Sequence, residues 1–323
     1  MTAWLSTPGK GLLRSEHGVR SGYRVAMVLI LALLLIPYLL NYLFFSVLFL
    51  FKLIHFHSGS SFNLPHLLFP MKMSVAQITH QLAYILQTLQ GFFASVIMFI
   101  STMLALWVMA RHEGRSIWFY FFNKTGGLKY FPIGIGCAFI VFFPLVIAIF
   151  KSHHVVDIPY LFSIFIAVLS CILVGFHEEL LFRGYVQKNL MCSMGFFPAL
   201  IVSSLLFGLA HVPNLSIAMI VHLPFQTLAY TFEHFCSGVL LCVGLRQTGT
   251  LWWSIGFHST WDFIITWYKP EALVKTHLVT SHQHGFHYAV AIIFFFGVFQ
   301  LILAGLFFIV KRAPRESLAL TAS

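Results

Sequence analysis

Three pairs of polar or aromatic side chains lie four residues apart within strongly apolar stretches of the chain. The pairs are Glu179 with Arg183, Phe207 with His211, and His258 with Asp262. Residues four apart lie on one face of a helix, so each pair would be presented on a common side of its helix. Carboxylates and imidazoles are the groups that proteins use most often for proton transfer. The spacing therefore predicts acid–base chemistry carried by three helical segments.

The adjacent acids Glu178 and Glu179 are the most unusual feature of these stretches. A charged side chain at the centre of a bilayer costs roughly 2.5–3.5 kcal/mol, so such residues are functional candidates. Glu179 precedes Arg183 by four residues, which is the favourable orientation for an ion pair within one helix. Glu178 lies about 100° away round the helix and does not share that neighbour. We expect Glu179 to be structural and Glu178 to be free to act as a base.

The expected depths of these residues are consistent with a single site. Glu178 lies about 18 Å from the inner end of a helix that runs to about residue 190. Counted from the inner ends of their own helices, His211 lies about 22 Å in, and His258 and Asp262 about 12 and 18 Å in. All four side chains can therefore reach a common level within the membrane.

The other ionisable residues are less distinctive. Glu233 and His234 form a weaker pair in an apolar stretch, and we expect them to face a polar cavity near the site. The remaining acids fall in expected loops or tails: Glu16, Glu113, Asp157, Glu271 and Glu316. Several histidines lack metal-ligand spacing and are expected to be solvated in loops: His55, His57, His66, His153, His154, His277, His282, His284 and His287.

A polytopic bundle of transmembrane helices must position these groups. Hydrophobic residues make up 59% of the 323 residues and charged residues 9%, with a mean hydropathy of +0.89. Soluble globular chains carry about 25% charged residues, so a soluble fold would lack a polar surface. Apolar windows of about 20 residues predict an all-α fold with about eight spans. Their approximate ranges are 25–51, 87–110, 130–150, 159–190, 196–211, 224–245, 251–268 and 287–310. The stretch 75–89 has helical periodicity and either lies at the interface or extends the second span.

The basic residues indicate an orientation. Most of the 19 Lys and Arg residues fall on one side of the membrane if the N-terminus is cytoplasmic. The net charge of +10 is then explained by topology, and no nucleic-acid partner is expected because the basic residues form no contiguous stripe. The chain divides into four parts: a basic cytoplasmic segment (1–24), N-terminal spans with their loops (25–158), and a core that carries the motifs (159–268). The last part (269–323) contains an outer loop, the final span and a basic tail.

The motifs Glu178-Glu179-x-x-x-Arg183, Phe207-x-x-x-His211 and His258-x-x-x-Asp262 resemble the signature motifs of the CAAX-protease and bacteriocin-processing (CPBP) family of intramembrane proteases. The resemblance covers about residues 160–268. It implies peptide-bond hydrolysis inside the membrane by an eight-helix bundle. It also implies that Glu178 activates a water molecule with help from His211. His258 and Asp262 would stabilise the tetrahedral oxyanion, and Glu179, Arg183 and Phe207 would support the site.

Two features of the implied chemistry stay open. The family has Asn or Asp at the last motif position, and Asp262 can donate to an oxyanion only when protonated; alternatively it orients His258. Glu178, His211 and His258 would suit a catalytic zinc with an open fourth position. However, no histidine follows His177 by four residues, so the usual His-Glu-x-x-His arrangement fails. A glutamate mechanism needs no metal, and we favour it.

The resemblance implies a peptide or membrane-protein substrate and a location in the lipid bilayer. The basic loops fit a bacterial inner membrane with both termini cytoplasmic, where prenylated substrates are unexpected. Other intramembrane proteases are excluded, because the chain has no G-x-S-x-G, no H-E-x-x-H and no pair of intramembrane aspartates.

Two other classes of function stay open as alternatives. A proton- or ion-coupled transporter would also bury Glu, His and Asp, although the paired broken helices typical of transporters are absent from the sequence pattern. A catalytically silent membrane scaffold could share the same fold.

Overall fold

The structure is a computed structural model of the 323-residue chain. It describes residues 14–15, 18–19, 21–40, 43, 75–114, 116–120, 127–143, 146–147, 158–212, 224–267 and 282–310. Near the N-terminus, β1 (Arg14–Ser15) and β2 (Gly18–Val19) form a short antiparallel ladder. Three predicted segments lie outside the described residues: the rest of the basic segment before Ser21, the outer loop 269–281 and the tail 311–323.

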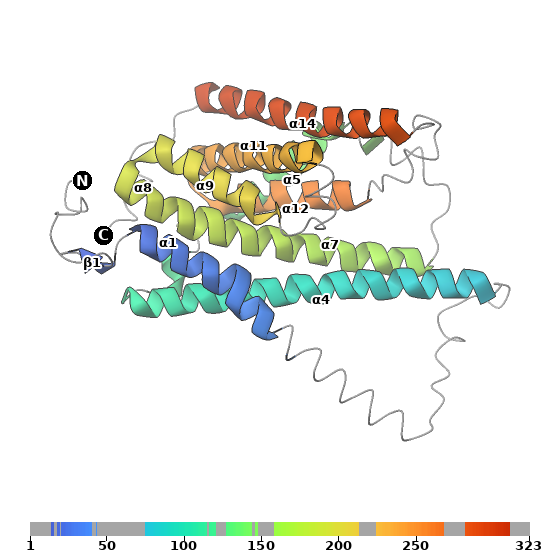
Figure 1. The fold of residues 1–323 in the computed structure, drawn as a ribbon, viewed down its shortest axis with the longest axis horizontal. Coiled ribbons are helices and arrows are strands. Elements are labelled where there is room, and N and C mark those ends of the chain that lie inside the picture. The colour runs from blue at the N-terminus through green and yellow to red at the C-terminus, as the bar shows by residue number, and fades with distance from the viewer. Residues whose placement is uncertain are drawn as a thin grey trace, which may run out of the picture.

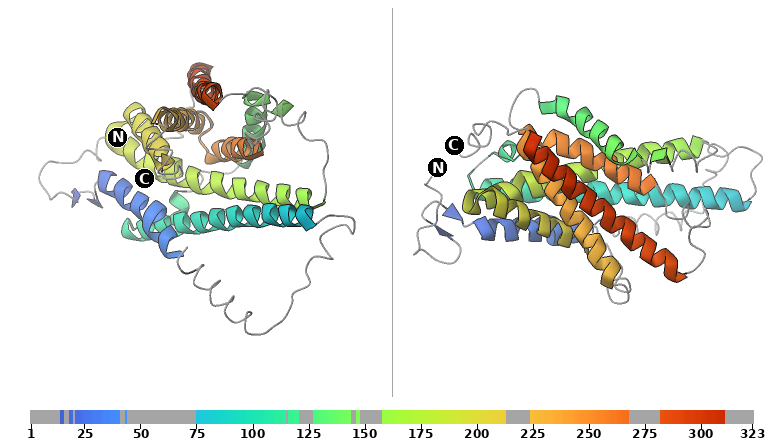
Figure 2. Two further views of the ribbon diagram at one scale, coloured as in Figure 1. Left: turned by 45° about the vertical axis from the view of Figure 1, so that its right-hand side comes forward. Right: turned by 90° about the horizontal axis from the view of Figure 1, so that it is seen from above.

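The other regular elements in the described ranges are helices, so the predicted all-α fold is confirmed. In chain order they are α1 (Ser21–Leu29), η1 (Ile30–Leu35), α4 (Val75–His112), η2 (Ile117–Phe119), η3 (Gly127–Lys129), α5 (Tyr130–Val141), α7 (Ile158–Glu179), η4 (Leu180–Gln187), α8 (Lys188–Met194), α9 (Phe196–Ala210), α11 (Pro224–Thr248), α12 (Leu251–Trp267) and α14 (His282–Val310). Figure 1 shows α4 lying along α7, with α14 on the opposite side of the bundle. In the views of Figure 2, α11 and α12 lie between α14 and α7.

Long apolar helices identify the chain as an integral membrane protein. Four helical stretches are long and apolar enough to cross a membrane: Gly22–Leu40, Thr88–His112, Leu161–Met194 and Thr227–Thr248. Three shorter helices are also apolar: Gly127–Val141, Phe196–Ala210 and Phe294–Ile309. Large apolar side chains on these helices are more than half exposed, among them Tyr38, Ile140, Phe225 and Ile309. Soluble monomers rarely expose so much contiguous apolar surface, whereas lipid covers it readily. The count of eight spans stays a prediction.

The helix bounds differ from the expected spans in several places. The first helix begins at Ser21, before the expected start at Val25. The second, α4, is continuous from Val75, so the stretch 75–89 extends the second span. The third, α5, ends at Val141, shortly before Pro144, which has no backbone N–H to continue a helix. The last helix begins at His282, which places His282, His284 and His287 in a helix rather than in a loop.

Two π-helical segments were not predicted from the sequence. The first, η1, ends shortly before Pro37, where the helical hydrogen-bond pattern is interrupted by the missing N–H of proline. The second, η4, directly follows Glu179 and contains Arg183. All of its residues are buried. π-Helical turns inside α-helices occur frequently at functional sites, and this one adjoins the paired glutamates.

Glu113 lies in the turn after α4, outside the helices as the sequence predicted, but its side chain is a buried anchor. Its carboxylate oxygens accept hydrogen bonds from the hydroxyl groups of Tyr120 and Tyr185 at 2.8 and 2.6 Å. Arg24 Nε lies 3.8 Å from the same carboxylate, whose side chain is 1% exposed. Because Arg24 belongs to α1 and Tyr185 to η4, Glu113 ties the first helix to the buried π-helical segment.

Small residues allow α9 and α11 to cross closely. A Cβ atom built on Gly208 would lie 2.7 Å from the carbonyl oxygen of Thr231. One built on Gly238 would lie 2.9 Å from the Cα atom of Ser204. Both neighbours are backbone atoms, so no side-chain rotation can relieve the contact. Close approach through small residues is the usual way in which membrane helices pack.

Gly208→Ala is therefore expected to destabilise the protein by about 1–3 kcal/mol, because the added methyl group pushes α9 and α11 apart. Gly305→Ala is the matched control, since nothing lies within 4 Å of its new Cβ atom. That control is expected to be neutral or slightly stabilising, because alanine favours a helix over glycine. Thermal unfolding in detergent compares the variants. Equal stability of the two would contradict the close crossing.

Candidate active site

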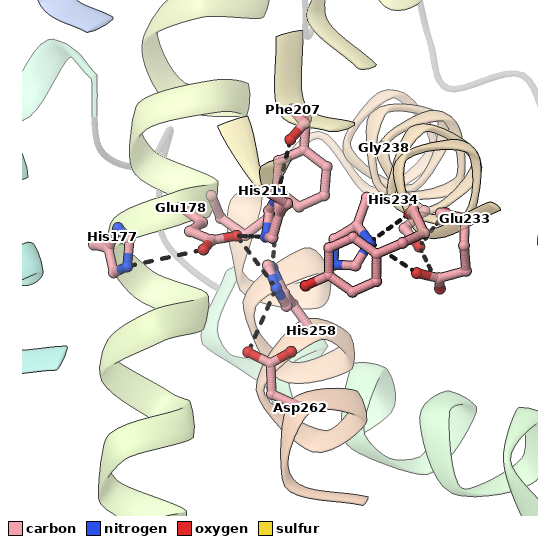
Figure 3. Close-up of polar contacts among 12 residues, drawn as sticks. His177, Glu178, Phe207, His211, Glu233, His234, Gly238, His258 and Asp262 are labelled. Atoms are coloured by element: carbon pink, nitrogen blue, oxygen red, sulfur yellow. Dashed lines mark hydrogen bonds and ion pairs between the residues drawn. The ribbon is translucent and has the colours of Figure 1, made fainter. Parts of the chain in front are cut away.

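Three helices bring the predicted site residues together. Glu178 and Glu179 end α7, His211 directly follows α9, and His258 and Asp262 lie on α12. Figure 3 shows Glu178 pointing toward His211 and His258, with Asp262 on the far side of His258. The three sequence patterns thus meet at one place, although they are separated by long stretches of chain.

Glu178 is the centre of the cluster. Its Oε2 atom lies 3.5 Å from Nε2 of His211 and 3.6 Å from Nε2 of His258. This oxygen is buried and accepts no hydrogen bond from the described residues. The other oxygen, Oε1, lies 4.0 Å from Nε2 of His177, a neighbour that the sequence patterns did not single out. The carboxylate therefore has an unused acceptor beside two imidazole rings, as a general base requires.

Glu179 contacts both Arg183 and His258. Its Oε1 atom lies 3.0 Å from Nη1 of Arg183, which confirms the predicted ion pair within the helix. The same oxygen lies 2.9 Å from Nδ1 of His258. A carboxylate bonded to one ring nitrogen fixes the orientation of an imidazole and leaves the other nitrogen for chemistry. Here Glu179 holds Nδ1 and directs Nε2 of His258 toward Glu178.

Arg183 and Phe207 pack against Glu179 and the two imidazoles. The Arg183 guanidinium lies 4.2 Å from the centre of the Phe207 ring, and its Nη2 donates to the carbonyl of Gly238 at 3.4 Å. The Phe207 ring is also in edge contact with His211 and His258, at 4.7 and 5.9 Å between ring centres. Phe207 is therefore a buried support that limits the movement of both imidazoles.

Asp262 occupies the outer side of the cluster. Its Oδ2 atom lies 3.6 Å from Nε2 of His258, and its side chain is 29% exposed, more than that of Glu178 or either imidazole. Because Glu179 already binds Nδ1 of His258, the orienting carboxylate is Glu179 in this geometry. Asp262 instead approaches Nε2 of His258, the same ring nitrogen that Glu178 approaches.

His234 is closer to the site than its weak sequence signal indicated. Its ring centre lies 4.1 Å from that of His211. Its Nδ1 atom lies 2.9 Å from the Tyr230 carbonyl oxygen and 3.0 Å from Oε2 of Glu233. Tyr230 and His234 are four residues apart, as in the other patterns, so the same spacing rule could have found this pair.

The zinc alternative requires three side chains arranged as metal ligands. Within the described ranges, no three His, Cys, Asp or Glu side chains are arranged so that they could hold a metal ion. Glu178, His211 and His258 are the residues that the zinc alternative would use, and a chelator added to the cleavage assay decides between the glutamate and the zinc mechanism.

These features define an all-helical membrane protein with an acid–base cluster buried between its helices. Residues 160–264 match a family model described as "Type II CAAX prenyl endopeptidase Rce1-like". The matched segment contains all the predicted site residues, from Glu178 to Asp262. The predicted resemblance to the CPBP family is confirmed over this segment, which is CAAX-protease-like. Searches of curated proteins and of solved structures gave no significant match.

Proposed function

We propose that the protein is an intramembrane endopeptidase that hydrolyses a peptide bond by a glutamate mechanism. The observation that carries the proposal is the Oε2 atom of Glu178, which is buried, accepts no hydrogen bond from the described residues and faces two imidazoles. In this mechanism Glu178 takes a proton from a water molecule, and His211 orients that water. The match of residues 160–264 to a protease family supports amide hydrolysis as the reaction.

The oxyanion that forms when water attacks the substrate carbonyl needs hydrogen-bond donors. His258 is the main donor in the proposed mechanism, in its imidazolium form: Nδ1–H donates to Glu179, and Nε2–H is held toward the reaction centre. Asp262 assists when protonated. Donors fixed in advance in a site with little water stabilise such charge strongly, since they need not reorganise during the reaction.

The proposed substrate is a peptide or a membrane protein that reaches the site from within the bilayer. The exposed apolar side chains of the helices support a lipid-embedded entry. We further propose a bacterial inner membrane and cytoplasmic termini, on the distribution of basic residues. Cys192 is exposed and lies near the C-terminal end of the third long span, four residues after Lys188. A membrane-impermeant thiol reagent is expected to label Cys192 in inverted vesicles only, and labelling in right-side-out vesicles would contradict this orientation.

A cleavage assay with purified protein in liposomes tests the proposed activity. The panel contains a farnesylated peptide ending in Cys-aliphatic-aliphatic-X, an unmodified peptide precursor and a single-span membrane protein. Wild type is compared with Glu178→Ala and His211→Ala, each with and without a chelator. Cleavage by wild type and its loss in both variants is expected. Cleavage that persists in both variants would overturn the proposed site, and loss in the chelator samples would overturn the metal-free mechanism.

The roles of His258 and Asp262 are separable by substitution. His258→Ala is expected to lower kcat by about 10²–10³, the usual effect of removing an oxyanion donor. Asp262→Asn is expected to keep most of the activity, because the asparagine amide can donate a hydrogen bond from the same position. Steady-state kinetics on a cleaved panel substrate measure both. A larger loss in Asp262→Asn than in His258→Ala would reverse the assignment.

A further inference from the structure

Breaking a peptide bond requires a proton at the leaving nitrogen, in addition to an activated water. An amine leaves readily only if its nitrogen is protonated as the C–N bond breaks, so proteases provide an acid as well as a base. In the proposed mechanism Glu178 and His211 act on the water, and His258 acts on the oxyanion. The acid for the leaving group is a separate requirement.

His234 packs against His211, one of the two residues that act on the water in the proposed mechanism. On α11, its ring is packed between those of Tyr230 and His211, at 4.2 and 4.1 Å between ring centres. Its side chain is 14% exposed, so it borders the site without being sealed off. Figure 3 shows His234 between His211 and Glu233.

His234 is anchored in the same way as His211. Nδ1 of His211 contacts the carbonyl oxygen of Phe207 at 2.8 Å, and Nδ1 of His234 contacts that of Tyr230 at 2.9 Å. A carbonyl oxygen can only accept, so Nδ1 carries a hydrogen in both rings. Nε2 is then the nitrogen that can exchange a proton. Nε2 of His211 is directed at Glu178, whereas no hydrogen bond from the described residues reaches Nε2 of His234.

Each of the two neighbouring imidazoles has its own carboxylate. Glu178 lies 3.5 Å from His211, and Glu233 lies 3.0 Å from His234. Glu233 is itself held in place, because its Oε1 accepts from Nε2 of Gln300 at 3.2 Å and from the Ser237 hydroxyl at 3.3 Å. Adjacent imidazolium ions repel each other, and a fixed carboxylate beside each ring offsets that repulsion. His234 can therefore hold a proton while His211 acts on the water.

We propose that His234, held by Glu233, is the general acid that protonates the leaving nitrogen. The inference rests on the proposed peptidase function. As the tetrahedral intermediate collapses, the C–N bond breaks and its electron pair stays on nitrogen. The Nε2–H bond of His234 breaks and a new N–H bond forms on the amine. Glu178 then holds the proton taken from water, and it releases that proton to solvent while His234 takes one up, which restores both groups.

Leaving-group chemistry tests this role. Each peptide of the cleavage panel is paired with a depsipeptide in which an ester oxygen replaces the scissile N–H. Alcohols leave far more easily than amines, so ester cleavage depends much less on an acid. His234→Gln is expected to lower kcat for the amide by about 10²–10⁴, and to lower it much less for the ester. Glu233→Gln is expected to show the same selectivity with a smaller loss, because it keeps the imidazole but removes its charge partner.

His112→Gln is the matched control. His112 is exposed at the end of α4, a helix that carries none of the proposed catalytic residues. It is expected to leave both reactions unchanged, and thermal unfolding shows whether each variant is folded. An equal loss of amide and ester cleavage in His234→Gln would mean that the residue only supports the site, which overturns the inference. Unchanged amide cleavage would overturn it as well. If wild type cleaves neither substrate of any pair, the proposed function fails and the inference fails with it. If wild type cleaves both substrates of a pair, the behaviour of the His234 variant alone decides whether the inference holds.

Discussion

Glu178→Gln is expected to lower kcat for peptide cleavage by about 10²–10⁴, the range for losing a general base. Glutamine has nearly the same shape as glutamate, so the contacts of α7 are preserved while Oε2 loses the ability to take a proton. KM is expected to change little, because the lost interaction acts on the water rather than on the bound substrate. Steady-state kinetics on a cleaved panel substrate give both constants.

Glu113→Gln is the matched control for this prediction, since it makes the same chemical change at another buried glutamate. Glu113 binds Tyr120 and Tyr185 outside the catalytic cluster. Its substitution is expected to lower the free energy of unfolding by about 1–3 kcal/mol, as weakened buried hydrogen bonds do, while kcat of the folded protein stays close to that of wild type. The prediction for Glu178 would be wrong if both variants lost activity to the same extent, because the effect would then follow from buried charge alone.

The sequence predicted those features of the fold that depend on local spacing. Apolar runs predicted the helices, because a membrane helix must present about 20 apolar residues in succession. The ion pair of Glu179 with Arg183 was predictable for the same reason, since partners four residues apart meet on any regular helix. The convergence of Glu178, His211 and His258 was also expected, from their common depth in the membrane.

The contacts that the sequence did not predict join residues of different helices. Glu179 was expected to be structural, yet it also holds Nδ1 of His258, a residue 79 positions later in the chain. No local pattern encodes that contact, because it depends on how α7 and α12 are packed together. The burial of Glu113 was not predicted for a similar reason, since the donors that contact its carboxylate come from α1, the η2 turn and η4.

Arg183→Met is expected to cause the largest loss of stability of any single change near the site. It leaves Glu179 buried without its main counter-charge, and breaking a buried ion pair in this way costs about 3–5 kcal/mol. It also removes the contact with the Phe207 ring at 4.2 Å. The free energy of unfolding in detergent is the measurement.

The double variant Glu179→Leu/Arg183→Met separates the two roles of Glu179. Replacing both charges with apolar side chains of similar volume is often neutral, so most of the lost stability is expected to return. Activity is expected to stay low, because no carboxylate remains to bind Nδ1 of His258 and direct Nε2 toward Glu178. A double variant as unstable as Arg183→Met would show that the pair is not an independent ionic unit. A stable double variant with normal kcat would show that Glu179 serves only as the partner of Arg183, and that His258 needs no carboxylate to be aligned.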